Sequence, residues 1–332
     1  MVLVTGGTGH LGNVLIKKLI TEGEKVRVLV QPGDSLYSLQ YLPIEVVYGD
    51  IRGDIKKAFS GVDAVFHLAS VISITNSNKK LIYSVNVDGT NNIINLAKEH
   101  RIPLIYVSSV HAFSEVKPGS VIDEKTPIDE NNVVGDYAKS KAIATKKVME
   151  AFKDGLSGFI VFPTGIFGPY DYRFSYFSRV LEKYRLGKLR ITVNGCFDFV
   201  DVRDVANSIV ALYNLLKERH YIVNHQSYIA SGNKIYFEKL PFLCGLRKYN
   251  ILKNSSARLM SYLTLLFNSL FKIPVEFVPY ALHTLELDYT FSHEKLSSTI
   301  AYHPRKVEET IQDFFKWLDE IHWTFYLPNL YY

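Results

Sequence analysis

The first half of the chain alternates short apolar runs with amphipathic stretches. Apolar runs of four to seven residues occupy 2–5, 25–30, 45–49, 63–69, 103–109 and 158–163. Between them, residues 10–22, 80–99 and 136–153 have apolar positions at helical spacing; in the first stretch these are Leu11, Leu15, Leu19 and Ile20. Apolar strands that alternate with helices predict a parallel sheet covered by helices on both faces.

The alternation ends after Pro169, where aromatic residues become frequent. A strand leading into a helix is predicted over 197–216, and further helices over 233–245, 255–271 and 306–321. We therefore predict an α/β fold: a doubly wound parallel-sheet Rossmann domain and a smaller, mostly helical C-terminal substrate lobe. The Rossmann domain takes residues 1–168 with a return segment at about 196–224, and the lobe takes 169–195 and 225–332.

Composition excludes several other classes. The net charge of +5 is mild and comes without long runs of one sign, so we expect no nucleic-acid partner. Two cysteines without metal-ligand spacing predict neither a disulfide framework nor a metal site. The apolar stretch 262–271 is too short to span a bilayer. The start MVLVTGG has no secretory signal, so a cytoplasmic location is expected.

A glycine-rich segment, TGGTGHLG, joins the first predicted strand to the first helix. Its glycines, Gly6, Gly9 and Gly12, give the spacing G-x-x-G-x-x-G. Glycine lets backbone approach a ligand closely, and a helix N-terminus attracts a pyrophosphate. A plain glycine-rich turn is the alternative, but the position within a strand–helix–strand unit favours a dinucleotide site.

The residue after the second strand selects between cofactors. An acid there binds the ribose 2′-hydroxyl of NAD, whereas an arginine nearby binds the 2′-phosphate of NADP. This chain has Gln31 at that point, followed by Pro32 and Gly33. Neither signal is present, so both cofactors stay open; we expect NADP, with NAD as the alternative.

Tyr137 and Lys141 are four residues apart in the predicted helix 136–153. A free tyrosine has a pKa of about 10, and a nearby cation favours the phenolate. Lowering that pKa to about 7 takes roughly 4 kcal/mol, so we expect Lys141 and the positive nicotinamide ring to share the task. A solvated helix with lysines on its outer face is the bland alternative.

These motifs together resemble the extended short-chain dehydrogenases/reductases. The matching stretches are TGGTGHLG, GDI at 49–51, DAVFHLA at 63–69, NVDGT at 86–90, YVSS at 106–109, YAKSK at 137–141, PTGIFGP at 163–169 and DFVDVRDVA at 198–206. Within that superfamily, VFHLASVISI and VSSVHAF are most similar to dihydroflavonol-4-reductase-like and hydroxysteroid dehydrogenase-like members. The resemblance implies Tyr137 as the acid/base, Lys141 on the nicotinamide ribose, and Ser109, rather than Ser108, as donor to the substrate carbonyl.

The same resemblance and the strand ends suggest which residues contact each ligand. For the cofactor we expect Gly6, Thr8, Gly9, His10, Leu11, Gly12, Gln31, Asp50, Ile51, Leu68, Ala69, Val107, Tyr137, Lys141, Pro163, Thr164 and Ile166. For the substrate pocket we expect Ser70, His111, Tyr170 and Phe174. His67 is interpreted as structural, and Asn86 either fixes backbone near the site or caps a helix.

Three functions stay in competition. The first is an NAD(P)-dependent oxidoreductase for a small or medium, rather apolar substrate. The second is a nucleotide-sugar epimerase or dehydratase with retained NAD; many of these carry arginines where this chain has Phe162 and Phe197. The third is a non-catalytic sensor or scaffold, which has no need of the Tyr137, Lys141 and Ser109 set.

A homodimer is the expected assembly. The resemblance implies pairing through helices at about 88–99 and 136–153, which form a four-helix bundle across a two-fold axis. Both helices carry apolar residues beyond the apparent need of one core face, among them Ile94, Met149 and Phe152. The four lysines within 136–153 favour the alternative, a monomer with a solvated outer face.

Overall fold

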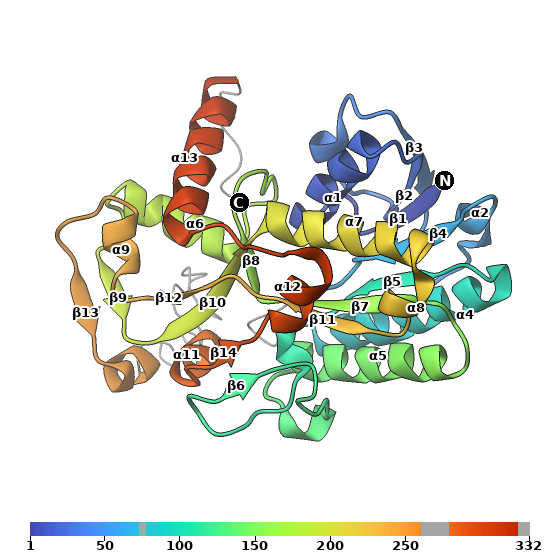
Figure 1. Cartoon of the computed structure of the whole chain (residues 1–332). Coiled ribbons are helices and arrows are strands. Elements are labelled where there is room, and N and C mark those ends of the chain that lie inside the picture. The colour runs from blue at the N-terminus through green and yellow to red at the C-terminus, as the bar shows by residue number, and fades with distance from the viewer. Residues whose placement is uncertain (73–77, 260–278, 325–332) are drawn as a thin grey trace.

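Seven parallel strands form the main sheet of the computed structural model, which describes residues 1–72, 78–259 and 279–324 (Figure 1). In spatial order they are β11 (Ser227–Ala230), β7 (Gly158–Pro163), β5 (Leu104–Val107), β4 (Ala64–His67), β1 (Val2–Thr5), β2 (Val26–Val30) and β3 (Ile44–Tyr48). The order reverses beside β1, where β4 lies on one side and β2 on the other. Ligands bind at such a switch point, outside the carboxyl ends of the strands.

Helices cover both faces of this sheet, as predicted. Helices α1 (His10–Thr21) and α7 (Val202–Glu218) lie on one face, and α4 (Thr90–His100) and α5 (Asp136–Lys153) on the other (Figure 1). Alternate strand residues enter opposite cores: Val2 and Val4 pack with α1 and α7, while Leu3 packs with α4 and α5. Burial on both faces explains why these strands are continuously apolar.

The helix predicted over 80–99 is present but has a wider central turn. It consists of α3 (Lys79–Tyr83), a π-helical segment (Ser84–Gly89) and α4. Segments of this kind often occur at functional sites. Here the π-helical segment carries Asn86, which is buried beside the carboxyl edge of the sheet.

The C-terminal portion packs around an aromatic core that includes Phe167, Tyr184, Phe199, Phe314 and Trp317. Its elements are β8 (Gly165–Phe167), α6 (Tyr176–Arg185), β9 (Ile191–Val193), β10 (Cys196–Asp201), β12 (Asn233–Tyr236), α9 (Leu240–Leu243), β13 (Asn250–Leu252), α11 (Pro279–Glu286), β14 (Thr290–Phe291), α12 (Glu294–Ile300) and α13 (Val307–Thr324). The remaining short elements are α2 (Lys56–Phe59), β6 (Val121–Ile122), α8 (His220–Val223), and 3₁₀ turns at Tyr37–Leu39, Val110–Ala112 and Glu130–Asn132.

Two of the predicted helices do not appear as predicted among the described residues. The helix predicted over 233–245 is wrong in its first half, because residues 233–236 form strand β12 and pair antiparallel with β10. Most of the helix predicted over 255–271 lies outside the described residues. In addition, strand β11 belongs to the main sheet, although its residues were predicted to belong to the smaller lobe.

Among the described residues, no helix has the length and apolar character needed to cross a membrane.

Candidate active site

A cleft of about 500 Å³ runs along the carboxyl ends of β1, β4, β5 and β7. The residues expected to contact the cofactor all line it: Gly6, Thr8, Gly9, His10, Leu11, Gly12, Gln31, Asp50, Ile51, Leu68, Ala69, Val107, Tyr137, Lys141, Pro163, Thr164 and Ile166. Ser70, Ser109 and His111 line it too. Residues spread over most of the chain therefore meet in one cavity, as the strand ends of a parallel sheet allow.

The glycine-rich turn at one end of the cleft fits a dinucleotide phosphate. Gly6 has φ +72°, a conformation that favours glycine. A side chain at Gly12 would overlap the carbonyl oxygen of Gly6, so Gly12 serves the packing of the turn. At Gly9 the nearest atom to an added Cβ is the Gly6 oxygen at 3.2 Å, and the residue lines the cleft. A ligand can therefore approach the backbone most closely at Gly9.

Two side chains that the sequence analysis missed lie beside this turn. Asp34 lines the cleft past the end of β2, and Arg173 reaches it from the segment after β8. The Arg173 Nη2 atom donates to Thr8 Oγ1 at 2.7 Å and to Asp34 Oδ2 at 2.8 Å. No local pattern signals the pair, because 139 residues separate its members.

Tyr137, Lys141 and Ser109 all line the cleft. Tyr137 and Lys141 lie in the first turns of α5, and Ser109 follows the end of β5. Their side chains are buried, at 8%, 3% and 7% relative exposure. Lys141 Nζ donates to the Val107 carbonyl at 2.9 Å and to Tyr106 Oη at 3.2 Å, which leaves one of its three N–H groups.

Burial dominates the electrostatics of this group. It raises the pKa of Tyr137 to about 12, against a smaller lowering by the Ser109 hydrogen bond. It also lowers the pKa of Lys141 to about 7. Lys141 is not among the groups that shift the pKa of Tyr137, and its Nζ atom is hydrogen-bonded to the Val107 carbonyl and the Tyr106 hydroxyl. The joint lowering by Lys141 and the nicotinamide ring stays a prediction.

The two serines after β5 have different partners. Ser108 Oγ is 2.6 Å from Thr145 Oγ1, and that hydroxyl donates to the Lys141 carbonyl at 2.7 Å. Ser108 thus ties β5 to the helix that carries Tyr137. Ser109 Oγ accepts from the His111 N–H at 3.3 Å. Ser109 also hydrogen-bonds Tyr137 and so lowers the pKa of that phenol, which places the Ser109 hydroxyl beside the tyrosine in the cleft.

Asn86 fixes the part of the cleft wall that Ser70 and Val71 form. Its Oδ1 atom accepts from the Val71 N–H at 2.8 Å and from Ser70 Oγ at 3.1 Å. Its Nδ2 atom donates to the Val71 carbonyl at 3.0 Å and to Ser140 Oγ at 2.9 Å. Asn86 thereby joins the segment after β4 to α5, so it holds backbone beside the site and is not a helix cap.

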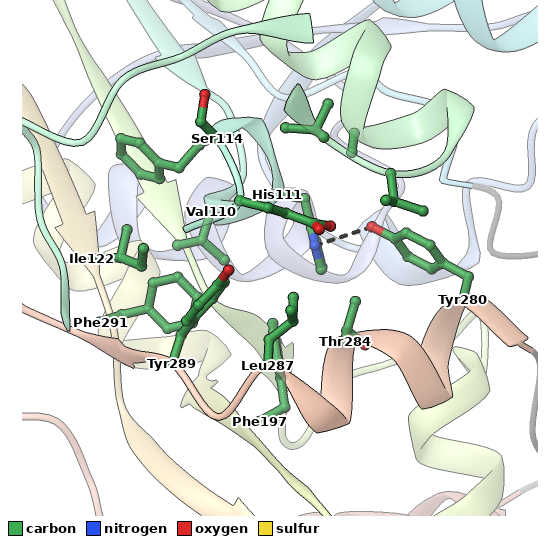
Figure 2. Close-up of a pocket in the computed structure, with 15 residues that line it drawn as sticks. Val110, His111, Ser114, Ile122, Phe197, Tyr280, Thr284, Leu287, Tyr289 and Phe291 are labelled. Atoms are coloured by element: carbon green, nitrogen blue, oxygen red, sulfur yellow. Dashed lines mark hydrogen bonds between the residues drawn. The ribbon is translucent and has the colours of Figure 1, made fainter. Parts of the chain in front are cut away.

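A second cavity, of about 30 Å³, adjoins the cleft behind His111 (Figure 2). His111 Nδ1 is 3.1 Å from the hydroxyl of Tyr280, and both residues also line the main cleft. Phe197 stacks on the His111 ring with centroids 5.4 Å apart. Burial lowers the pKa of His111 to about 4, so its ring is neutral at neutral pH. Tyr280 was not among the predicted site residues, because it lies in α11 and reaches the site only through tertiary packing.

Two residues expected in the substrate pocket lie elsewhere. The rings of Tyr170 and Phe174 pack on Trp317 in the aromatic core of the lobe, with centroids 6.1 Å and 6.4 Å away. Neither lines the cleft. The excess of aromatic residues was interpreted as a sign of a substrate pocket, whereas these two side chains pack against the core of the smaller lobe. Among the described residues, no group of three or more His, Cys, Asp or Glu side chains could hold a metal ion.

The sheet, the glycine-rich turn and the cleft define a Rossmann-fold protein of the extended short-chain dehydrogenase/reductase class. Residues 3–251 match the 3-beta hydroxysteroid dehydrogenase/isomerase family, and the chain belongs to that family. Family membership confirms the resemblance that the sequence motifs indicated.

Several curated relatives align over about two thirds of the chain. Sterol demethylase protein B of Methylococcus capsulatus is 32% identical over 224 residues, which cover 67% of this chain and 68% of the relative. A putative dihydroflavonol 4-reductase of Synechocystis is 30% identical, with 69% of each chain covered. Human short-chain dehydrogenase/reductase family 42E member 1 is 33% identical over 70% of this chain and 63% of its own.

Solved structures share the whole architecture. The crystal structure of gox2253 superposes with a TM-score of 0.81 at 26% identity, covering 97% of this chain and 98% of the other. A dTDP-glucose 4,6-dehydratase from Bacillus anthracis, solved in complex with NAD, gives 0.73 at 17% identity and covers 96% of each chain. The second likeness shows the fold alone.

Proposed function

We propose that the protein is an NAD(P)-dependent oxidoreductase that reduces a carbonyl, or oxidises the alcohol, of a small to medium, rather apolar substrate. The observation that carries the proposal is the convergence of Tyr137, Lys141 and Ser109 in the cleft that begins at the glycine-rich turn. Names of relatives point the same way: besides the putative dihydroflavonol 4-reductase, a quinoline-oxide ketoreductase of Stigmatella aurantiaca is 30% identical over 52% of this chain.

The lining of the cleft supports a specific placement of the cofactor in this proposal. Gly6, Gly9 and the start of α1 would hold the pyrophosphate, because backbone is accessible there and the helix dipole is positive. Asp50 and Gln31 would lie at the adenosine end, and Pro163, Thr164 and Ile166 at the nicotinamide end. When bound, the cofactor supplies or accepts the hydride.

Tyr137 would act as the acid during carbonyl reduction. With its pKa raised to about 12, the phenol keeps its proton at neutral pH until negative charge develops on the substrate oxygen. Ser109 would donate a second hydrogen bond to that oxygen and polarise the carbonyl. Lys141 would use its remaining N–H toward the cofactor ribose, while its bonds to Val107 and Tyr106 hold its side chain in place.

We further propose that the smaller lobe selects the substrate, and that NADP is the preferred cofactor. His111, Phe197 and Tyr280 place aromatic surface beside Tyr137 with no cation among them, which suits an apolar substrate. For the cofactor, Arg173 provides beside Thr8 the cation that the end of β2 lacks. Asp34, its ion-pair partner, is the competing feature that would suit NAD.

The nucleotide-sugar alternative receives less support from the site. Phe197, at one position where such enzymes were expected to carry arginine, stacks on His111 in the proposed substrate region. Phe162 does not help to distinguish the two functions, because it is fully buried in β7 and packs on Phe113.

Replacement of Tyr137 by phenylalanine tests the proposal. Loss of the acidic proton should lower turnover about 10²- to 10⁴-fold with NADPH and a panel of apolar ketones, while the affinity for NADPH is retained. The matched control is Tyr83→Phe, which removes a hydroxyl bonded to Asp136 outside the cleft and should keep turnover. Near wild-type kcat in Tyr137→Phe would exclude the mechanism.

A further inference from the structure

One end of the smaller lobe carries an unusual concentration of positive charge. Residues 186–190 and 236–253, named here the basic tip, contain six lysines or arginines and a single acid, Glu238. The six are Lys188, Arg190, Lys239, Arg247, Lys248 and Lys253, and all are exposed. The Oε2 atom of Glu238 is shielded from solvent. The basic tip therefore carries as much net positive charge as the whole chain, whose net charge is +5.

The segments of the basic tip lie side by side. Strand β9 pairs with β13, and the Asn250 N–H donates to the Arg190 carbonyl at 2.9 Å. Leu246 lies next to Gly187, at the end of the turn that follows α6. Figure 1 shows β9, β13 and α9 together at the end of the molecule far from β3 and α2. The cations thus gather at one end of the protein.

These cations have no acidic partners among the described residues, unlike many elsewhere in the chain. Lys98 pairs with Asp154, Lys217 with Glu24, and Arg305 with Asp204. In the basic tip, Arg190 Nε donates only to the Gly187 carbonyl, and the Lys239 ammonium lies over the Tyr236 ring at 5.6 Å. The charges are therefore available to an external anionic surface.

Large apolar side chains project from the same segments. Leu186, Phe242 and Ile251 are 53%, 59% and 50% exposed, and Tyr236 is 45% exposed. Single exposed apolar residues are ordinary, but four of them among unpaired cations form a mixed surface. An anionic bilayer fits both components, because lysine and arginine meet the lipid phosphates and carboxylates while aromatic and aliphatic side chains enter the interface. Nucleic acid would use the cations but would leave Leu186 and Ile251 without a role.

We propose that the basic tip docks the protein peripherally on membranes that contain anionic lipid. The proposal is independent of the oxidoreductase function, since it needs neither cofactor nor substrate. It requires no membrane-spanning segment: each cation near an anionic surface contributes about 1 kcal/mol, and the apolar side chains add to this by burial.

Co-sedimentation of the full chain with vesicles tests the proposal. We expect binding to vesicles of phosphatidylcholine with phosphatidylserine, little binding to phosphatidylcholine alone, and a decrease as salt is raised. The double variant Arg247→Glu/Lys248→Glu should bind roughly tenfold less or weaker still. Its matched control, Lys56→Glu/Lys57→Glu, changes two exposed neighbouring lysines of α2 at the opposite end and should bind as the wild type does.

The apolar component is tested separately. Phe242→Ser should weaken vesicle binding severalfold at a salt concentration that screens the charges, whereas Tyr221→Ser, which removes an 81% exposed ring on α8, should not. Far-ultraviolet circular dichroism of each variant checks the fold. Equal binding to both vesicle types, unchanged binding by Arg247→Glu/Lys248→Glu, or binding of a single-stranded RNA without any binding of vesicles would overturn the proposal. Tyr137→Phe should bind vesicles normally, so failure of the catalytic proposal would be recognised separately.

Discussion

His67 links three elements of the fold through its two ring nitrogens. Nδ1 is 2.7 Å from Thr5 Oγ1 in β1, and Nε2 is 2.9 Å from Thr90 Oγ1 in α4. Burial lowers the pKa of His67 to about 3, so the ring is neutral and one nitrogen donates while the other accepts. This agrees with its interpretation as a structural residue at the end of an apolar strand.

The low pKa of His67 predicts a pH dependence of stability. The unfolded chain binds the proton below the ordinary pKa of 6.5, while the folded state does not bind it until about pH 3. The contribution of the neutral His67 ring to the free energy of unfolding is thus complete above pH 6.5. It is lost progressively as the pH falls toward the pKa of about 3 in the folded state. Between about pH 7 and pH 4, urea unfolding should show a loss on the order of 3 kcal/mol in the wild type beyond that of His67→Asn. An equal loss of unfolding free energy in the wild type and in His67→Asn would contradict this prediction.

Residues whose roles depend on local spacing could be predicted from the sequence, and residues placed by tertiary packing could not. Tyr137 and Lys141 share a helix face by their spacing alone, and Ser109 follows a recognisable strand. Asp34, Arg173 and Tyr280 reach the same cleft from segments without a motif. Tyr170 shows the opposite error, because aromatic character cannot distinguish a pocket wall from a lobe core.

The glycine-rich turn contains two glycines with different requirements. Gly9→Val places a branched side chain where backbone faces the cleft, so NADPH affinity should fall at least about tenfold while the fold is retained. Gly12→Val would force a side chain into the Gly6 carbonyl and should lower the melting temperature. Calorimetric titration and thermal unfolding separate the two effects. Unchanged NADPH affinity in a folded Gly9→Val protein would count against the cofactor site.

The π-helical segment around Asn86 predicts a loss of stability on mutation. Asn86→Leu removes four hydrogen bonds and leaves the N–H and the carbonyl of the half-buried Val71 without their Asn86 partner. We expect the free energy of unfolding to drop by about 2–4 kcal/mol in urea titrations. Asn91→Leu, one turn further along on an exposed position, is the control and should change stability by less than about 0.5 kcal/mol. A similar small change in both variants would show that Asn86 does not hold the cleft wall.

Helices and strands, like site residues, could be predicted where local sequence determines them and not where distant contacts do. Central strands and long helices could be predicted because burial on two faces, or on one helical face, leaves a pattern in the sequence. Strand β12 was predicted as helix because its pairing with β10 depends on residues far away in the chain. Strand β11 was missed for a related reason: four residues at a sheet edge carry too little pattern to be distinguished from loop.

Contact between the smaller lobe and the glycine-rich turn bears on cofactor choice for the whole molecule. If Arg173 binds the 2′-phosphate, Arg173→Ala should lower NADPH affinity about tenfold or more and leave NADH affinity nearly unchanged. Asp34→Asn should instead strengthen NADPH binding, since it removes a competing carboxylate from Arg173. Fluorescence titration with both nucleotides measures this, with exposed Arg179→Ala as the control. Equal loss for both nucleotides in Arg173→Ala would assign the arginine to lobe contact alone.

Two of the apolar residues that suggested a homodimer interface on α4 and α5 are not available to a partner. Ile94 and Phe152 are each only 4% exposed, because both pack in the chain's own core. The exposed positions of α4 are polar, whereas Ile143 and Met149 remain partly exposed on α5 and are the apolar positions left for a partner there.

Light scattering at micromolar concentration tests the dimer. We predict a dimer with a mass near twice the 37.9 kDa of one chain. In this dimer, α4 and α5 of each subunit pack against each other across a two-fold axis. Met149→Glu would then place two carboxylates near that axis and shift the mass toward a single chain. Phe152→Lys is unsuitable, because it would charge the core and unfold the protein. Val121→Glu, at a 64% exposed position, is the control and should leave the mass unchanged. A wild-type mass of one chain would refute the dimer; a stable dimer in Met149→Glu would place the interface elsewhere.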